Sequence, residues 1–215
     1  MYKLVLFDFD GTLLDSDMML LKTFEELYAI HRPGKTITFE KTVSFSGPPI
    51  KETLAKEFPE LDKEEILREY ISLSLKNYEK YVRLFPGVED MLIELNRRGV
   101  KFGLITSKNR EATDFTFSLL GLEGYFPLSI TSDEVEHLKP YPDGIFATMK
   151  FFNEYNKDEI IYVGDGLIDY LTARAAGIKF ALVDYSPRKE NIPNDIDLLI
   201  KDFNDLLEVI DYEKN

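Results

Sequence analysis

Five apolar runs constrain the fold of this 215-residue chain more than any other feature of its sequence. The runs are nearly continuous and do not alternate between apolar and polar residues, which is typical of parallel strands covered on both faces. Helical patterns lie between most of the runs, so we predict an α/β fold with a doubly wound, Rossmann-like parallel sheet. The expected strands cover residues 3–8, 100–106, 127–131, 160–165 and 178–184, and residues 196–200 extend the alternation.

One long stretch of the sequence does not fit this alternation. Between Asp15 and Arg83 we find no candidate strand, and three helical patterns follow one another. A connection of this length is too long for an ordinary crossover between two strands of a sheet. We therefore predict that residues 15–83 form an inserted, all-helical cap domain. The core domain would then comprise residues 1–14 and 84–215.

The composition limits the partners and the location of the chain. With 26 basic and 39 acidic residues, its net charge is −13. Such a surface repels polyanions and anionic lipids, so we expect neither nucleic acid nor a membrane as a partner. The first apolar run is interrupted at Asp8, so it does not resemble a signal peptide, and we expect a cytoplasmic protein. The absence of cysteine excludes disulfides and thiolate metal sites, and the sequence leaves monomer and homodimer open.

Polar residues stand where several of the expected strands end. Asp8 ends the first strand, Thr106 the second and Asp165 the fourth. Ligands of open parallel sheets bind beyond the carboxyl ends of the strands, so this edge is the expected site. Asp8 and Asp10 would share a face about 6.6 Å apart on extended backbone, which leaves room for a phosphoryl-sized group. Each of these residues, taken alone, would most often be the start of a loop.

Two further acidic residues lie at the start of an expected helix. Asp165 and Asp169 are four residues apart, so a helix would place them on one face. They would then be available together for a site at the end of the fourth strand. The alternative is that both simply stabilise the positive N-terminal end of that helix.

Four short motifs combine these residues in a recognisable order. They are "DFDGT" at residues 8–12, "LITS" at 104–107, "HLKPYPD" at 137–143 and "GDGLID" at 164–169. In this order and at these structural places, they resemble the four motifs of the haloacid-dehalogenase superfamily of phosphotransferases. The resemblance covers nearly the whole chain. It is strongest to the subgroup with a helical cap after the first motif, which includes phosphoglycolate phosphatases, pyrophosphatases and β-phosphoglucomutases.

The resemblance implies a covalent mechanism that depends on a metal. Asp8 would attack phosphorus and become an aspartyl phosphate, and Asp10 would act as general acid and then as general base. A Mg²⁺ ion would be held by the carboxylates of Asp8 and Asp165 and by the backbone carbonyl of Asp10. Crowded carboxylates and a phosphate need such a cation, because two like charges 4 Å apart repel by about 4 kcal/mol at an effective dielectric of 20. Oxygen ligands and a phosphate suit Mg²⁺.

The resemblance also implies roles for residues around the phosphoryl group. Lys139 would supply positive charge to the phosphoryl oxygens, and the Thr106 hydroxyl and the backbone N–H of Ser107 would bind the same oxygens. Asp169 would orient Lys139 or a water on the metal. Without the other motifs, Lys139 would be interpreted as a solvated loop lysine.

Two smaller groups of residues remain ambiguous in the sequence. Lys108 and Asn109 either contact the substrate or begin a helix. The loop at residues 42–50 lies before a cap helix, and its Ser44 and Ser46 either bind an anionic group or belong to a turn stiffened by prolines.

We therefore expect a Mg²⁺-dependent phosphatase for small phosphorylated metabolites, with phosphoglycolate-like monoesters as first candidates. The enzymatic alternatives are a pyrophosphatase and a β-phosphoglucomutase-like phosphotransferase. The non-enzymatic alternative is a signalling module with a phosphorylated aspartate, although such receiver domains are much shorter and carry no helical cap.

Overall fold

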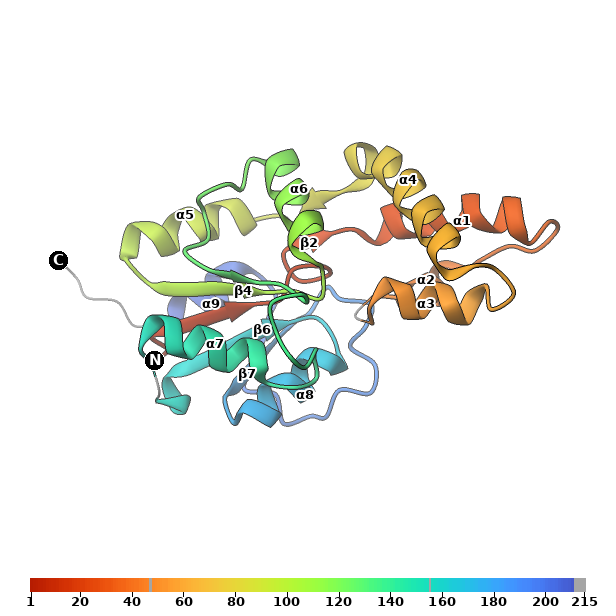
Figure 1. Ribbon diagram of the computed structural model, residues 1–215. Coiled ribbons are helices and arrows are strands. Elements are labelled where there is room, and N and C mark those ends of the chain that lie inside the picture. The colour runs from red at the N-terminus through yellow and green to blue at the C-terminus, as the bar shows by residue number, and fades with distance from the viewer. Residues whose placement is uncertain (47, 155, 211–215) are drawn as a thin grey trace. The chain divides into compact units, whose positions relative to one another are not determined.

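A parallel sheet forms the centre of the computed structural model, which describes residues 1–46, 48–154 and 156–210 (Figure 1). In the described part of the chain, six strands follow the order β5-β4-β1-β6-β7-β8, and every pair of neighbours is parallel. The predicted α/β fold with a Rossmann-like core is therefore confirmed. The strands are β1 (Leu4–Phe7), β4 (Lys101–Ile105), β5 (Ser129–Ile130), β6 (Ile160–Gly164), β7 (Lys179–Val183) and β8 (Leu198–Ile200).

The first strand of the chain occupies the middle of the sheet. All four residues of β1 are buried, as their uninterrupted apolar sequence requires. Its last residue, Phe7, is in register with Leu104 of β4 on one side and with Val163 of β6 on the other. The carboxyl ends of β4, β1 and β6 therefore lie side by side at one edge of the sheet.

The edge strand β5 is shorter than predicted. Residues 127–131 were expected to form a strand, but only Ser129 and Ile130 pair with β4. β5 lies at the edge of the sheet and pairs only with β4, and edge strands are commonly short because each one leaves a row of unpaired backbone groups.

Helices cover both faces of the sheet. Figure 1 shows α5 above it and α7 and α8 below it. Tyr162 of β6 and Ile145 of α7 belong to the buried cluster on the side of α7 and α8. The helices of this unit are α5 (Val88–Arg98), α6 (Arg110–Leu120), α7 (Asp143–Phe152), α8 (Leu167–Ala176) and α9 (Phe203–Glu208), with a 3₁₀ turn at Lys157–Glu159.

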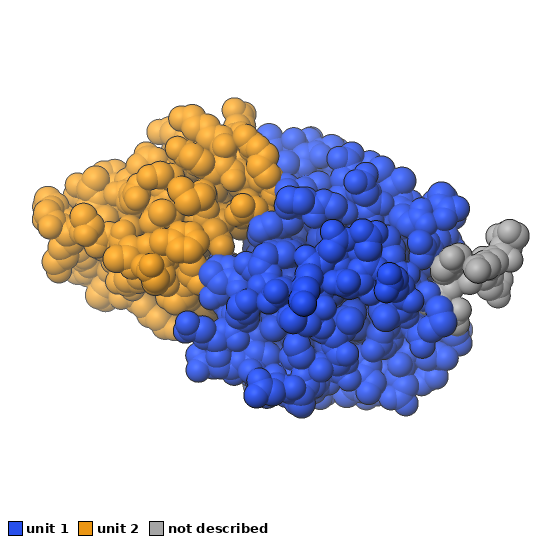
Figure 2. Space-filling model, turned by 180° about the vertical axis from the view of Figure 1, so that it is seen from behind, with its two compact units in different colours: residues 1–13, 84–215 blue, residues 14–83 orange. Residues whose placement is uncertain are grey.

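The chain divides into two compact units, coloured separately in Figure 2. One comprises Met1–Leu13 and Leu84–Asn215, and the other is Leu14–Arg83, which lies within one residue of the expected cap. Short strands β2 (Leu14–Asp15) and β3 (Arg83–Leu84) pair with each other where the chain passes between the units. The second unit contains the helices α1 (Asp17–His31), α2 (Phe39–Val43), α3 (Ile50–Glu57) and α4 (Lys63–Tyr81).

The helical unit has a hydrophobic core of its own. Phe24, Leu54, Phe58 and Ile66 are almost completely buried in one cluster, so each of α1, α3 and α4 contributes to it. Across both units, no helix among the described residues has the length and apolar character needed to span a membrane.

Candidate active site

A buried lysine joins two of the acidic residues at the sheet edge. Asp8 directly follows β1, and its Oδ1 accepts a hydrogen bond from Nζ of Lys139 at 2.6 Å. The same ammonium donates to Oδ1 of Asp169, in the first turn of α8, at 2.8 Å. The three side chains are only 5–8% exposed. Residues from three distant motifs therefore meet within one ion-paired cluster.

A third carboxylate completes a group that can hold a cation. Asp8, Asp165 and Asp169 each offer one oxygen, and these oxygens all lie within 4.8 Å of one another. Gly11 leaves the space for this group, because a Cβ at that position would be only 2.1 Å from Oδ2 of Asp165. A set of carboxylate oxygens suits a hard cation such as Mg²⁺, so these side chains fit the metal that the sequence predicts.

The electrostatics of the group also favour a cation. Burial raises the pKa of Asp8 to about 7, with a further increase from Asp169, whereas Lys139 opposes the shift. Burial and the charge of Asp169 raise the pKa of Asp165 well above its usual range. Burial alone would lower the pKa of Lys139, but Asp169 and Asp8 outweigh it and hold that pKa well above its ordinary value. The carboxylates are thus incompletely neutralised, and a divalent cation would stabilise their ionised forms.

Asp10 has a cation of its own. Its Oδ2 accepts a hydrogen bond from Nζ of Lys108, in the loop between β4 and α6. Lys108, which the sequence left ambiguous, therefore lies next to a predicted catalytic residue. Asn109 instead occupies the start of α6, where its side chain accepts a hydrogen bond from the backbone N–H of Ala112 at 2.9 Å. For Asn109, the structure supports the helix-capping interpretation.

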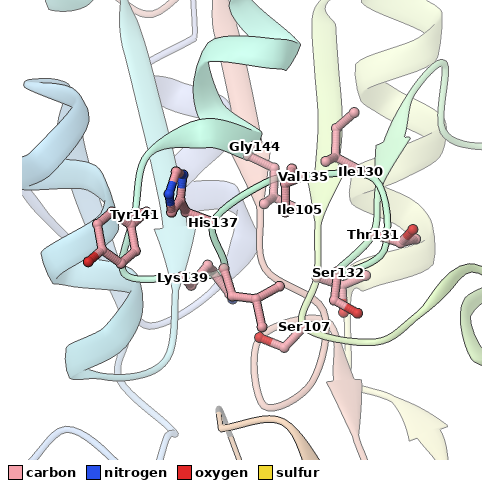
Figure 3. A pocket seen from close by; sticks show the side chains of 12 residues that line it. Ile105, Ser107, Ile130, Thr131, Ser132, Val135, His137, Lys139, Tyr141 and Gly144 are labelled. Carbon is pink, nitrogen blue, oxygen red and sulfur yellow. The ribbon is translucent and has the colours of Figure 1, made fainter.

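The predicted phosphoryl-binding residues line one small pocket. Thr106, Ser107 and Lys139 contribute to its walls, together with residues that follow β5 (Figure 3). The Thr106 side chain is buried, and its hydroxyl accepts a hydrogen bond from the backbone N–H of Lys108 at 3.1 Å. The turn after β4 is therefore fixed next to Lys139.

The predicted anion-binding loop of the cap shows mainly turn contacts. Ser44 donates its hydroxyl to the backbone carbonyl of Lys41 at 2.7 Å, and the backbone N–H of Ser46 donates to Val43 at 3.3 Å. Gly47 belongs to the same predicted loop but lies outside the described residues. The contacts of Ser44 and Ser46 fit a turn, and the predicted anion binding by this loop stays a prediction.

Three residues at the site were missed by the sequence reasoning. The Tyr162 hydroxyl donates to Oδ1 of Asp169 at 3.1 Å, and Lys139 donates to that hydroxyl at 3.2 Å. Arg188 and the Ser186 hydroxyl both donate to Oδ2 of Asp165, at 2.9 and 3.1 Å.

A usable signal existed for the loop that carries Ser186 and Arg188. This loop follows β7, the neighbour of β6, and therefore leaves the sheet at the same edge as Asp165. The topology alone could therefore have added the polar and basic residues of this loop to the predicted site residues. Tyr162 gave a weaker signal, because a tyrosine inside an apolar strand is usually a core residue.

Comparisons with known proteins agree with this fold. The haloacid dehalogenase-like hydrolase family matches residues 5–183. The pyrophosphatase PpaX of Halalkalibacterium halodurans is 30% identical over 208 residues, which cover 96% of this chain and 95% of that protein. The PpaX of Bacillus pumilus is 29% identical over the same shares of the two chains.

Solved structures show the same architecture. A HAD-superfamily hydrolase of subfamily IA from Geobacter sulfurreducens superposes with a TM-score of 0.73 at 23% identity, covering 96% of this chain and 95% of its own. CbbY from Rhodobacter sphaeroides, crystallised in complex with phosphate, reaches a TM-score of 0.80 at 20% identity, covering 96% of each chain. These two likenesses establish the fold.

Together, the matches define a class of enzyme, the phosphatase-type hydrolases with a Rossmann-like core. The chain belongs to the haloacid dehalogenase-like hydrolase family. The family resemblance predicted from the four motifs is therefore confirmed.

Proposed function

We propose that this protein is a Mg²⁺-dependent phosphatase that hydrolyses small phosphorylated metabolites through an aspartyl phosphate on Asp8. One observation carries the proposal. Lys139 pairs with both Asp8 and Asp169, and Asp165 lies in the same group of carboxylates at the end of the central strands. A buried nucleophile beside a fixed ammonium is the arrangement that transfer of a phosphoryl dianion requires.

The two aspartates after β1 have different tasks in this proposal. A carboxylate oxygen of Asp8 forms a bond to phosphorus while the bond from phosphorus to the leaving oxygen breaks. Asp10 gives that leaving oxygen a proton, and then takes a proton from the water that hydrolyses the aspartyl phosphate. Phosphate leaves, Asp8 is again a carboxylate, and Asp10 is again a protonated carboxyl, as it was before the first step.

The remaining residues hold and neutralise the phosphoryl group. Lys139, the Thr106 hydroxyl and the backbone N–H of Ser107 would bind its oxygens, and Asp169 keeps Lys139 in place through their 2.8 Å contact. The carboxylates of Asp8 and Asp165, with the backbone carbonyl of Asp10, would hold Mg²⁺. When bound, this ion would draw negative charge from the phosphoryl oxygens.

Two substrate classes are favoured by different observations. Phosphoglycolate-like monoesters remain the first candidates, on the resemblance of the motifs and the cap. Pyrophosphate is the second candidate, because relatives that match 96% of this chain are named pyrophosphatases. A β-phosphoglucomutase-like transfer would use the same Asp8 but return the phosphoryl group to a sugar.

The test is release of inorganic phosphate from phosphoglycolate, pyrophosphate and β-glucose 1-phosphate, with Mg²⁺ or with excess chelator. We expect release from one or more of these compounds only with Mg²⁺, and loss of release in Asp8→Asn. Asp114→Asn serves as the matched control, because that side chain is 61% exposed on α6 and should leave turnover intact.

Three results would contradict the proposal in different ways. Turnover by Asp8→Asn would show that Asp8 is not the nucleophile. Turnover in excess chelator would show that the reaction does not need a metal. Isomerisation of the sugar phosphate that depends on a bisphosphate primer would instead indicate a phosphotransferase. A phosphorylated aspartate that persists for minutes without phosphate release would indicate a signalling role.

A further inference from the structure

The ion pair between Lys108 and Asp10 is distinct from the ion pairs of Lys139. Lys139 donates to Asp8 and Asp169, whereas Lys108 donates to Oδ2 of Asp10. The Lys108 side chain is 15% exposed and that of Asp10 is 22% exposed, so the pair is more accessible than the Asp8 cluster. Each aspartate of the first motif therefore has its own positive charge beside it, Lys139 at Asp8 and Lys108 at Asp10.

The backbone at Lys108 is fixed by bonds on both of its sides. Its N–H donates to the Thr106 hydroxyl at 3.1 Å, and its carbonyl accepts from the N–H of Ser132 at 2.9 Å. The next residue, Asn109, caps α6. A lysine on a mobile surface loop would lack these constraints. The ammonium of Lys108 is therefore delivered to Asp10 by a rigid turn.

The location of Asp10 indicates which part of the substrate lies near Lys108 during the reaction. Under the proposed function, Asp10 protonates the leaving oxygen, so the leaving group must contact the Asp10 carboxylate. A cation within hydrogen-bond distance of that carboxylate then lies beside the leaving group, whereas Lys139 lies beside the phosphoryl group that Asp8 attacks. A positive charge at the leaving group favours leaving groups that are themselves anionic.

We propose that Lys108 is a specificity-determining residue that binds a negatively charged leaving group. This inference rests on the proposed function and narrows the substrate class of the proposed phosphatase. Preferred substrates release an anion, such as the second phosphate of a pyrophosphate or the carboxylate-bearing alcohol of phosphoglycolate, and esters of neutral alcohols are poorer. The net charge of −13 repels anions at long range, so a local cation favours the binding of an anionic leaving group.

Lys108 takes no covalent part in this reaction. The phosphorus–oxygen bond to the leaving group breaks, its electron pair stays on the leaving oxygen, and the proton comes from Asp10. Lys108 contributes charge and a hydrogen bond to the anionic group of the leaving fragment. If Lys108 only held Asp10 in place, its removal would slow the hydrolysis of all substrates by the same factor. If it binds the leaving group, its removal would slow the hydrolysis of substrates with anionic leaving groups most.

The experiment compares two substrates that differ only at the leaving group. Phosphoglycolate carries a carboxylate where 2-hydroxyethyl phosphate carries a neutral hydroxymethyl group. We expect Lys108→Met to lower the ratio of their kcat/KM values by about 10- to 100-fold, the usual range for losing a charge-assisted hydrogen bond. Lys108→Arg should keep the ratio within about threefold.

Lys101→Met is the matched control, because Lys101 lies at the other end of β4 with its side chain 45% exposed. It should leave the ratio unchanged. Hydrolysis of 2-hydroxyethyl phosphate reports whether Lys108→Met is folded. An equal fall for both substrates in Lys108→Met would overturn the inference.

Calorimetric titration in the Asp8→Asn background measures binding without turnover. There, adding Lys108→Met should weaken phosphoglycolate binding at least tenfold relative to 2-hydroxyethyl phosphate. Unchanged relative binding would refute the role of Lys108. The wild type could release no phosphate while binding still favours phosphoglycolate in a way that depends on Lys108. That result would support the role of Lys108 and refute only the proposed chemistry.

Discussion

The Asp8 carboxyl should make the stability of the metal-free protein fall as the pH rises. Burial raises its pKa to about 7, Asp169 adds to this increase, and Lys139 opposes it. In the unfolded chain, the same carboxyl titrates near its ordinary value of 3.8. The folded state therefore binds more protons than the unfolded state between these values. Stability from this group is fully present below about pH 4 and is lost as the pH passes through about 7.

The size of this stability change follows from the difference between the pKa of Asp8 in the unfolded chain, 3.8, and in the folded protein, about 7. At about 1.4 kcal/mol per pH unit, the whole effect is about 4 kcal/mol. About 2–3 kcal/mol of it should be lost between pH 5 and pH 8. The pKa of Asp165 is raised in the same direction by burial and by Asp169, so its contribution has the same sign.

Urea denaturation in excess EDTA, followed by circular dichroism at several pH values from 5 to 8, measures this dependence. The Asp8→Asn variant cannot titrate at this position, so its stability should vary less over the same range. Added Mg²⁺ should stabilise the wild type more at pH 8 than at pH 5, because it binds the ionised carboxylates. A wild type whose stability is flat or rises with pH in EDTA would refute the reasoning, as would an equal slope in Asp8→Asn.

Three further substitutions test parts of the site. Lys139→Met leaves two buried carboxylates without their cation, so it should abolish phosphate release and lower the free energy of unfolding in EDTA by about 3–5 kcal/mol. Gly11→Ala should weaken Mg²⁺ binding at least tenfold by calorimetry, because its Cβ would lie 2.1 Å from Oδ2 of Asp165. Gly34→Ala is its control, with a similar φ of 81° but nothing within 4 Å of the added Cβ, so unchanged binding in Gly11→Ala would contradict the packing argument. Tyr162→Phe removes a hydroxyl bonded to Lys139 and should cost about 1 kcal/mol in urea denaturation, and no measurable loss would contradict its role.

Much of the fold could be predicted because buried parallel strands leave a strong mark on the sequence. A strand covered on both faces must be apolar throughout, and β1, β4, β6 and β7 all lie within the expected runs. The length predicted for β5 was wrong, since periodicity does not show how far an edge strand stays paired with its neighbour. Sequence patterns therefore located the strands better than their ends.

The candidate site could be predicted only where a residue lies directly at a strand end or in a motif. Asp8 and Asp165 follow β1 and β6, so the parallel topology alone brings them to one edge. The partners of these residues depend on side-chain directions within loops, which no periodicity encodes. This is why the contact of Arg188 with Asp165 and that of Lys108 with Asp10 emerged only from the structure.

The most direct measurement of the central claim is chemical trapping of the phosphorylated residue during turnover. Borohydride reduces an aspartyl phosphate to homoserine, which mass spectrometry of the digested protein can assign to one position. For an enzyme quenched while it releases phosphate in Mg²⁺, we predict this conversion at position 8. Conversion at position 10 or 165, or no conversion during continued phosphate release, would contradict the account.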